Sequence, residues 1–242
     1  MRLVYLVISI VISCTASLGA TIEGSATVID GNRILVGATL IGLHGIETPE
    51  SNQRCDLGNG TKWFCGRAAA IVLMQLVQEY ELRCNYEKAR AHNIPEIRAR
   101  CRVGDQDVGA AMVQRGMAWV MPDAPSEYFR LQAIAVSNKI GIFQAPTERA
   151  AALRERLWQK AKTHAPNGCP IKGNIDLVGR RIYHLPWSQW YALTKVSTDQ
   201  GERWFCSERR AIEAGWQHGA WNFVPRLNPD DMPEGGVLQN QR

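Results

Sequence analysis

The chain has 242 residues, which is enough for one well-packed domain and a smaller partner domain. It carries 28 Lys and Arg residues against 23 Asp and Glu residues, so its formal net charge is +5. This balance suits an acidic partner, but it is too small to identify nucleic acid or any other class of ligand.

The N-terminus has the layout of a secretory signal. Arg2 precedes an apolar run over residues 3–12, and small residues follow up to Ala20. The run is too short to cross a ~30 Å membrane core as a permanent helix, so residues 1–19 are assigned to a signal peptide. An alternative stays open, because the sequence ending at Cys14 resembles a bacterial lipoprotein box. The protein is therefore expected to be exported, as a periplasmic, secreted or lipid-anchored protein.

Export determines how the cysteines are interpreted. Without Cys14 the chain has an even set in an oxidising compartment, where disulfides are the default. One pair would close a Gly-rich loop, one would bridge neighbouring strands, and one would tie the ends of the C-terminal segment. The predicted pairs are Cys55–Cys65, Cys84–Cys101 and Cys169–Cys206. A zinc site is an alternative for the last pair with His184 and His218, but no close Cys-x-x-Cys pair is present.

Strands and then a helix are predicted after the signal. Apolar residues alternate with small or polar ones over residues 26–43, with breaks at Gly31-Asn32 and Gly37-Ala38, as in strands joined by tight turns. The period becomes helical over residues 67–79. The next predicted elements are a strand pair, at residues 81–86 and 98–103, and two short helices, at residues 108–115 and 126–138.

The C-terminal half begins with a charged helix over residues 147–162, within a connector assigned to residues 147–168. A small Cys- and Trp-rich module follows at residues 169–220, and a flexible tail at 221–242. Aromatic and basic side chains alternate in the module, which would allow stacking on sugars or bases, although the aromatic residues could equally form its core. These residues are Trp187, Trp190, Tyr191, Trp204 and Trp216, with Lys172, Arg180 and Arg181.

Two motifs in the first half carry a family resemblance. They are Val28-Ile29-Asp30-Gly31-Asn32 and Ile46-Glu47-Thr48-Pro49-Glu50. With further segments in the same order up to Phe143, they resemble the thermonuclease (staphylococcal-nuclease-like) family. The resemblance implies a β-barrel plus α fold of the OB type over residues 20–146, followed by a second, small Cys/Trp-rich α+β module. That module, residues 169–220, resembles the sunset domain that follows thermonuclease-like domains in some exported bacterial proteins.

The resemblance implies a calcium site that this chain retains only in part. Such nucleases use calcium, held by two carboxylates and a backbone carbonyl, to polarise a phosphodiester. By position, Asn32 and Glu47 take the carboxylate roles and Thr48 the carbonyl role. Asn32 lacks the charge, and Glu47 is longer than the usual Asp, so calcium binding is expected to be weak if it occurs. Glu50 matches the general base, although its carboxylate could also serve only to cap a turn.

The phosphate-binding cations are missing. The resemblance places Gly42 and Glu96 where the family carries arginines, which bind phosphate with a planar fork of donors. A glycine offers no side chain there, and a glutamate repels the substrate. The nearby arginines that could substitute are Arg33, Arg90 and Arg98.

These features predict an exported thermonuclease-like protein with a degenerate nuclease site, which serves as a binding or assembly component of the cell envelope. Some members of the resembled family are associated with succinoglycan biosynthesis, so a link to exopolysaccharide biosynthesis is an expectation. The alternatives are an active calcium-dependent endonuclease with a rearranged site and an envelope scaffold anchored by a lipid on Cys14. The expected ligand is nucleic acid or another anionic polymer, and no cofactor other than calcium is implied.

Overall fold

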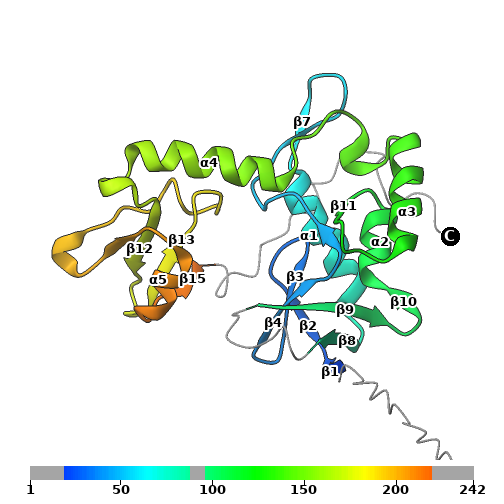
Figure 1. Ribbon diagram of the computed structural model, residues 1–242, viewed down its shortest axis with the longest axis horizontal. Coiled ribbons are helices and arrows are strands. Elements are labelled where there is room, and N and C mark those ends of the chain that lie inside the picture. Colours follow the sequence, from blue (N-terminus) through cyan, green and yellow to red (C-terminus); the bar gives the residue numbers. More distant parts are fainter. Residues whose placement is uncertain (1–18, 88–95, 220–242) are drawn as a thin grey trace, which may run out of the picture.

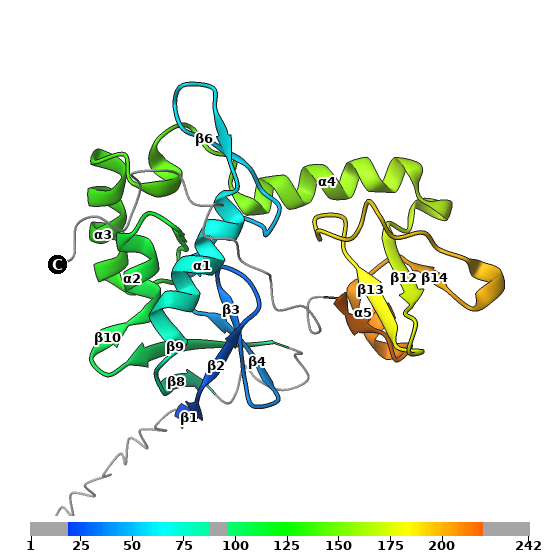
Figure 2. The same ribbon diagram turned by 180° about the vertical axis from the view of Figure 1, so that it is seen from behind.

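The computed structural model describes residues 19–87 and 96–219. Figure 1 shows two bodies connected by the long helix α4, and Figure 2 shows the same arrangement from behind. Each body has its own cluster of buried apolar side chains. The predicted signal peptide up to residue 18, with Cys14, and the predicted tail 221–242 lie outside the described residues.

The larger body is built on one seven-stranded sheet. The hydrogen-bonded order is β1-β8-β9-β4-β3-β2, with β10 beside β9, and β4 pairs with β9 in parallel while the other pairs are antiparallel. The strands are β1 (Gly19–Gly24), β2 (Ala26–Val28), β3 (Arg33–Val36), β4 (Thr39–Leu43), β8 (Leu82–Glu87), β9 (Ile97–Val103) and β10 (Gln106–Asp107). The predicted strands and the breaks between them are confirmed. This described path ends at β1 and β2, and the barrel implied by the resemblance stays a prediction.

Helices pack against this sheet as the helical periods predict. α1 and α2 contact the sheet, and α3 packs on α2. Their bounds are α1 (Cys65–Val77), α2 (Val108–Gln114) and α3 (Ser126–Ser137), followed by the short helix η2 (Gly141–Phe143). α1 turns alanine and aliphatic side chains into the core, and the Asp107 carboxylate caps α2 by accepting a 2.9 Å hydrogen bond from the Ala110 N–H. Two short strand pairs complete this body: β5 (Ile46–Glu47) with β11 (Trp119–Val120), and β6 (Cys55–Asp56) with β7 (Lys62–Trp63).

The three predicted disulfides are confirmed. The Cα separations are 5.6 Å for Cys55–Cys65, 4.0 Å for Cys84–Cys101 and 4.0 Å for Cys169–Cys206, all inside the limit of about 7 Å that a disulfide allows. The first joins β6 to α1, and the second joins directly paired positions of β8 and β9. Three disulfides indicate an oxidising compartment outside the cytoplasm. In residues 19–87 and 96–219, every helix falls short of the length and hydropathy that a bilayer span requires.

The smaller body contains a four-stranded sheet of order β14-β12-β13-β15 and one helix. Its elements are η3 (Pro166–Gly168), β12 (Ile171–Ile175), β13 (Arg181–His184), η4 (Thr198–Gln200), β14 (Arg203–Phe205), α5 (Glu208–Glu213) and β15 (Gln217–His218). Trp216 lies in its core, where the indole packs edge-on against Phe205 with 5.3 Å between ring centroids. A Cβ on Gly173 would lie 2.7 Å from the Trp216 ring, so this strand position must be a glycine.

Helix α4 (Ala150–His164) begins later than predicted and does more than connect. The Thr147 hydroxyl donates hydrogen bonds to the carbonyls of Ile142 (2.9 Å) and Ala145 (3.1 Å), which holds the chain in a turn before the helix. Ala150 is fully buried in the larger core, while Trp158 packs against the smaller one. Its two ends are therefore fixed to different bodies.

Candidate functional site

The two motifs of the family resemblance lie next to each other. The Leu43 N–H donates a 2.8 Å hydrogen bond to the Asn32 carbonyl, which attaches the turn before β3 to the end of β4. A Cβ on Gly31 would lie 2.7 Å from the Thr48 hydroxyl, so the absence of a side chain at Gly31 allows this close approach. The structure thus places the turn of Gly31 and Asn32 beside Thr48, and the calcium-ligand roles of Asn32, Glu47 and Thr48 stay a prediction.

The carboxylates of Glu47 and Glu50 are occupied by two arginines of α4 and its N-terminal cap. Arg154 donates from Nη1 to Glu50 Oε1 at 2.6 Å and from Nη2 to Glu47 Oε1 at 2.8 Å. Arg149 donates from Nε to the other Glu47 oxygen at 3.1 Å. The Glu47 and Glu50 side chains are only 7% and 14% exposed. One guanidinium therefore bridges the two acidic side chains that the resemblance assigns to catalysis.

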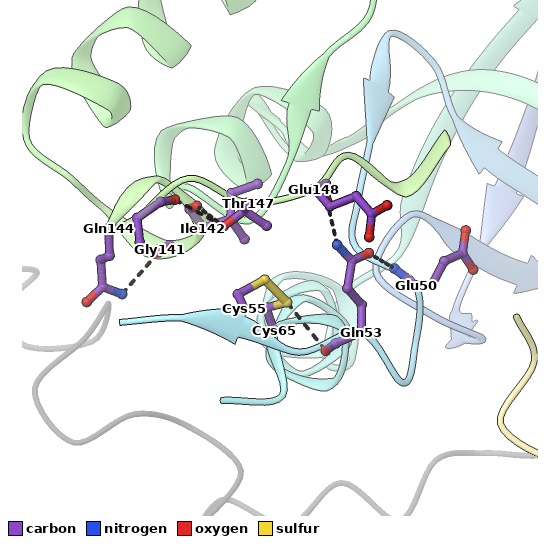
Figure 3. The surroundings of a disulfide bond; sticks show 10 residues. Glu50, Gln53, Cys55, Cys65, Gly141, Ile142, Gln144, Thr147 and Glu148 are labelled. Atoms are coloured by element: carbon purple, nitrogen blue, oxygen red, sulfur yellow. Dashed lines mark hydrogen bonds between the residues drawn. A yellow bond between two sulfur atoms is a disulfide. The ribbon is translucent and has the colours of Figure 1, made fainter. Parts of the chain in front are cut away.

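Gln53 fixes the turn of Glu50 to the segment that enters α4. Its amide accepts a 3.1 Å hydrogen bond from the Glu50 N–H and donates a 2.6 Å hydrogen bond to the Glu148 carbonyl (Figure 3). Gln53 is 6% exposed, and Cys55 and Cys65 lie beside it in Figure 3. The buried amide thus attaches the turn of Glu50 to the segment from which α4 begins.

Glu96 occupies the space that Gly42 leaves empty. A Cβ on Gly42 would overlap the Glu96 carboxylate. Burial raises the pKa of Glu96, while the charges of Arg33 and Arg98 oppose this rise. The Arg98 Nε lies 3.7 Å from Glu96 Oε1, and its side chain is 55% exposed. The two positions where the resemblance places arginines thus hold a glycine and a partly buried carboxylate, with an exposed cation beside it.

Arg33 is held by Asp30. The Asp30 carboxylate accepts hydrogen bonds from the Arg33 N–H at 2.9 Å and from Arg33 Nε at 2.6 Å. The charge of Asp30 raises the pKa of the Arg33 guanidinium further. This pair caps the turn before β3 and directs Arg33 toward a carboxylate. Of the other two candidate substitutes, Arg98 lies beside Glu96, and Arg90 is outside the described residues.

A comparison with known proteins identifies one related protein. The chain is 30% identical over 137 residues to the succinoglycan biosynthesis protein ExoI of Rhizobium meliloti (strain 1021), and the match covers 55% of this chain and 70% of the relative. The chain belongs to the family of this protein. No family model matches the sequence.

The side chains of this family member do not fit a calcium ion in the arrangement described. Calcium takes six to eight oxygen ligands, preferably from free carboxylates. Both oxygens of Asp30 and both oxygens of Glu47 already accept hydrogen bonds, those of Glu47 from Arg149 and Arg154. The guanidinium charges lie where a cation would have to bind. In residues 19–87 and 96–219, no group of three acidic, His or Cys side chains is placed to hold a metal ion.

Sequence reasoning missed Arg149 and Arg154. They lie more than 100 positions along the chain from Glu47, in a segment whose composition indicates only a charged helix. The available signal is that apolar residues gather on one side of the helix near its start. Ala150 and Leu153 are buried there, next to Arg149 and Arg154. A helix that buries one side near its start must pack on something, and its neighbouring arginines then face the same surface.

The smaller body faces this region through two buried histidines. His184 Nε2 is 2.8 Å from the Asn174 side-chain oxygen, while its Nδ1 is buried with no hydrogen-bond partner among the described residues. Burial lowers the pKa of His184 to about 4, and Lys172 adds to this. Burial also lowers the pKa of His218 to about 3, helped by the charge of Arg33 across the two bodies. Cys169 and Cys206 form a disulfide, so they provide no thiolate for the alternative zinc site.

The folded protein is expected to lose stability between pH 7 and pH 5. An unfolded histidine takes up a proton near pH 6.5, whereas His184 and His218 stay neutral in the fold down to about pH 4 and pH 3. The unfolded chain therefore binds more protons below pH 6.5, and each histidine should lower the free energy of unfolding by about 2 kcal/mol at pH 5.

Urea unfolding at pH 7.5, 6 and 5 measures this slope. His184→Gln should reduce the slope by about one proton. Equal stability of the native chain at pH 7.5 and pH 5 would show that both histidines accept protons in the fold.

Proposed function

We propose that this protein is an exported, thermonuclease-like member of its family in which the hydrolytic site has become a salt-bridged structural element. Its role is then binding or assembly in exopolysaccharide biosynthesis rather than phosphodiester hydrolysis. In this proposal the larger body is the OB-type domain that the sequence motifs resemble, and α4 with the smaller body is attached across its former active site.

The observation that carries the proposal is the bridge from Arg154 to Glu47 and Glu50. A general base must accept a proton from water through a free carboxylate oxygen, and one Glu50 oxygen already accepts a 2.6 Å hydrogen bond from Arg154. Burial raises the pKa of Glu50 and the charge of Arg154 opposes this rise, so the guanidinium competes with water for the carboxylate. Glu96 beside Gly42 adds a second obstacle, because an anion faces the place of the phosphate.

The relative and the disulfides support the setting. The related protein is named for succinoglycan biosynthesis, and succinoglycan is an exopolysaccharide. Three disulfides suit a protein that works outside the cytoplasm, where such polymers are assembled or exported. A periplasmic or lipid-anchored location follows from the predicted N-terminal signal.

Hydrolysis of DNA and RNA in millimolar calcium tests the proposal. The native chain and its Glu50→Gln variant should give the same residual rate of hydrolysis, because Glu50 does not act as a base in the native chain. Both should be retained on a column that carries an acidic polysaccharide. Chelator-sensitive cleavage by the native chain that Glu50→Gln abolishes would establish a working nuclease and overturn the proposal.

A further inference from the structure

A cavity lies where the second half of α4 crosses the smaller body. Its volume is about 430 Å³, within the range of about 300–1,000 Å³ that small-molecule sites occupy. α4 contributes Leu157, Lys160 and His164 to the wall, and the smaller body contributes Lys172, Tyr191 and Trp204. Basic and aromatic side chains from two separate segments therefore converge on one cavity.

Lys172 is the most rigidly held group in this wall. Its ammonium donates hydrogen bonds to the carbonyls of Tyr191 (2.8 Å) and Thr194 (2.7 Å). It also lies 4.4 Å from the centre of the Tyr191 ring and 5.7 Å from that of Trp204. An ammonium has three N–H donors, so the two carbonyls leave one for a ligand. The cation is thus oriented before any ligand binds, which lowers the entropy cost of binding.

The cavity has a defined charge and polarity. Its basic members are Lys160, His164 and Lys172, and among the residues that the structure describes no Asp or Glu lines it. The rest of the wall is apolar or aromatic, including Trp204 and Leu157. Such a wall fits a ligand with an apolar face and a negative group at one end. A pyranose ring with a carboxylate has this pattern, because its C–H face stacks on an aromatic ring while the carboxylate pairs with ammonium groups.

We propose that this cavity binds a short acidic saccharide, with the carboxylate at Lys160 and Lys172 and a sugar ring against Trp204. The inference rests on the proposed binding role and names its ligand class. A nucleic-acid strand fits less well, because it carries a charge on every nucleotide and needs a basic groove along its length. Here the basic groups gather in one cavity of limited size.

Calorimetric titration with oligogalacturonides of two to four residues tests this site, with their methyl esters as uncharged ligands of the same shape. Lys160→Ala should lower the affinity for the acidic saccharide about five-fold or more, since it removes one charge-assisted contact. The affinity for the methyl ester should stay unchanged. Lys162→Ala is the matched control, because Lys162 is also an exposed lysine of α4 but does not line the cavity. Trp204→Ala should lower the affinities for the acid and the ester alike, and Trp190→Ala should lower neither affinity.

Three results would overturn the assignment: no binding of the acid at millimolar concentration, equal affinities of the native chain and Lys160→Ala, or tighter binding of a dinucleotide than of the acidic saccharide. These outcomes are separate from those of the nuclease assay. Retention on an acidic polysaccharide that Lys160→Ala leaves intact would refute the cavity and keep the binding role. Glu50-dependent cleavage, together with saccharide binding that depends on Lys160, would refute the proposed non-hydrolytic role and keep the cavity as a binding site.

Discussion

A variant that carries the residues of the resembled thermonuclease family and lacks the arginine bridge is expected to hydrolyse DNA at least about 100-fold faster than the native chain. The restored positions are Asn32→Asp, Gly42→Arg and Glu96→Arg. Arg149→Ala and Arg154→Ala then release Glu47 and Glu50. One preorganised charge contact commonly contributes about 10²–10³ in rate, so the combination should be measurable even in an imperfect frame.

The order in which the changes are made tests the structural explanation. Gly42→Arg alone should destabilise the fold, because its new side chain overlaps Glu96. The three restored residues without the arginine changes should gain little activity, since Arg154 still holds Glu50. Calcium should raise the melting temperature of the variant with all five substitutions and leave that of the native chain unchanged.

Glu50→Gln added to the variant with five substitutions is the control for contaminating nuclease. It should return the rate of DNA hydrolysis to background. Circular dichroism must first show that each variant is folded. If the variant with five substitutions is folded and binds calcium but stays inactive, the larger body is not a nuclease frame.

Removal of Arg154 from the otherwise native chain is expected to lower the free energy of unfolding by about 2–3 kcal/mol. Arg154→Ala removes the guanidinium that hydrogen-bonds to the Glu50 carboxylate, which is 14% exposed, and leaves Glu47 with its contact to Arg149. Loss of one partner of a buried ion pair costs up to about 5 kcal/mol. The lower figure applies because Arg154 is itself 37% exposed, and water can reach the vacated space.

Arg156→Ala is the matched control on the same helix. Arg156 pairs with Glu148 at 2.7 Å, but both side chains are exposed, so this change should cost less than about 1 kcal/mol. Glu50→Gln added to Arg154→Ala should recover part of the stability, because it removes the uncompensated charge. Urea unfolding of the four proteins measures these differences. Equal stability of Arg154→Ala and Arg156→Ala would mean that the bridge has no structural role.

The sequence by itself determined the local elements and the covalent connections. Alternating apolar residues predicted β2, β3 and β4, and the helical period predicted α1, because both patterns depend only on neighbouring positions. The even cysteine set behind an export signal predicted disulfides, and the three pairs are as expected. The resemblance to thermonucleases predicts altered chemical positions at Asn32, Gly42 and Glu96, and these assignments stay predictions.

Only the tertiary structure decided which side chains surround Glu50 and Gly42. No local pattern relates Arg154 to Glu50, because 104 positions separate them and the contact exists only when Ala150 packs into the larger core. The proximity of Glu96 to Gly42 likewise requires β4 to lie beside β9, a parallel pairing between distant segments. Charge pairing between distant segments depends on side-chain direction and distance, which composition and periodicity do not encode.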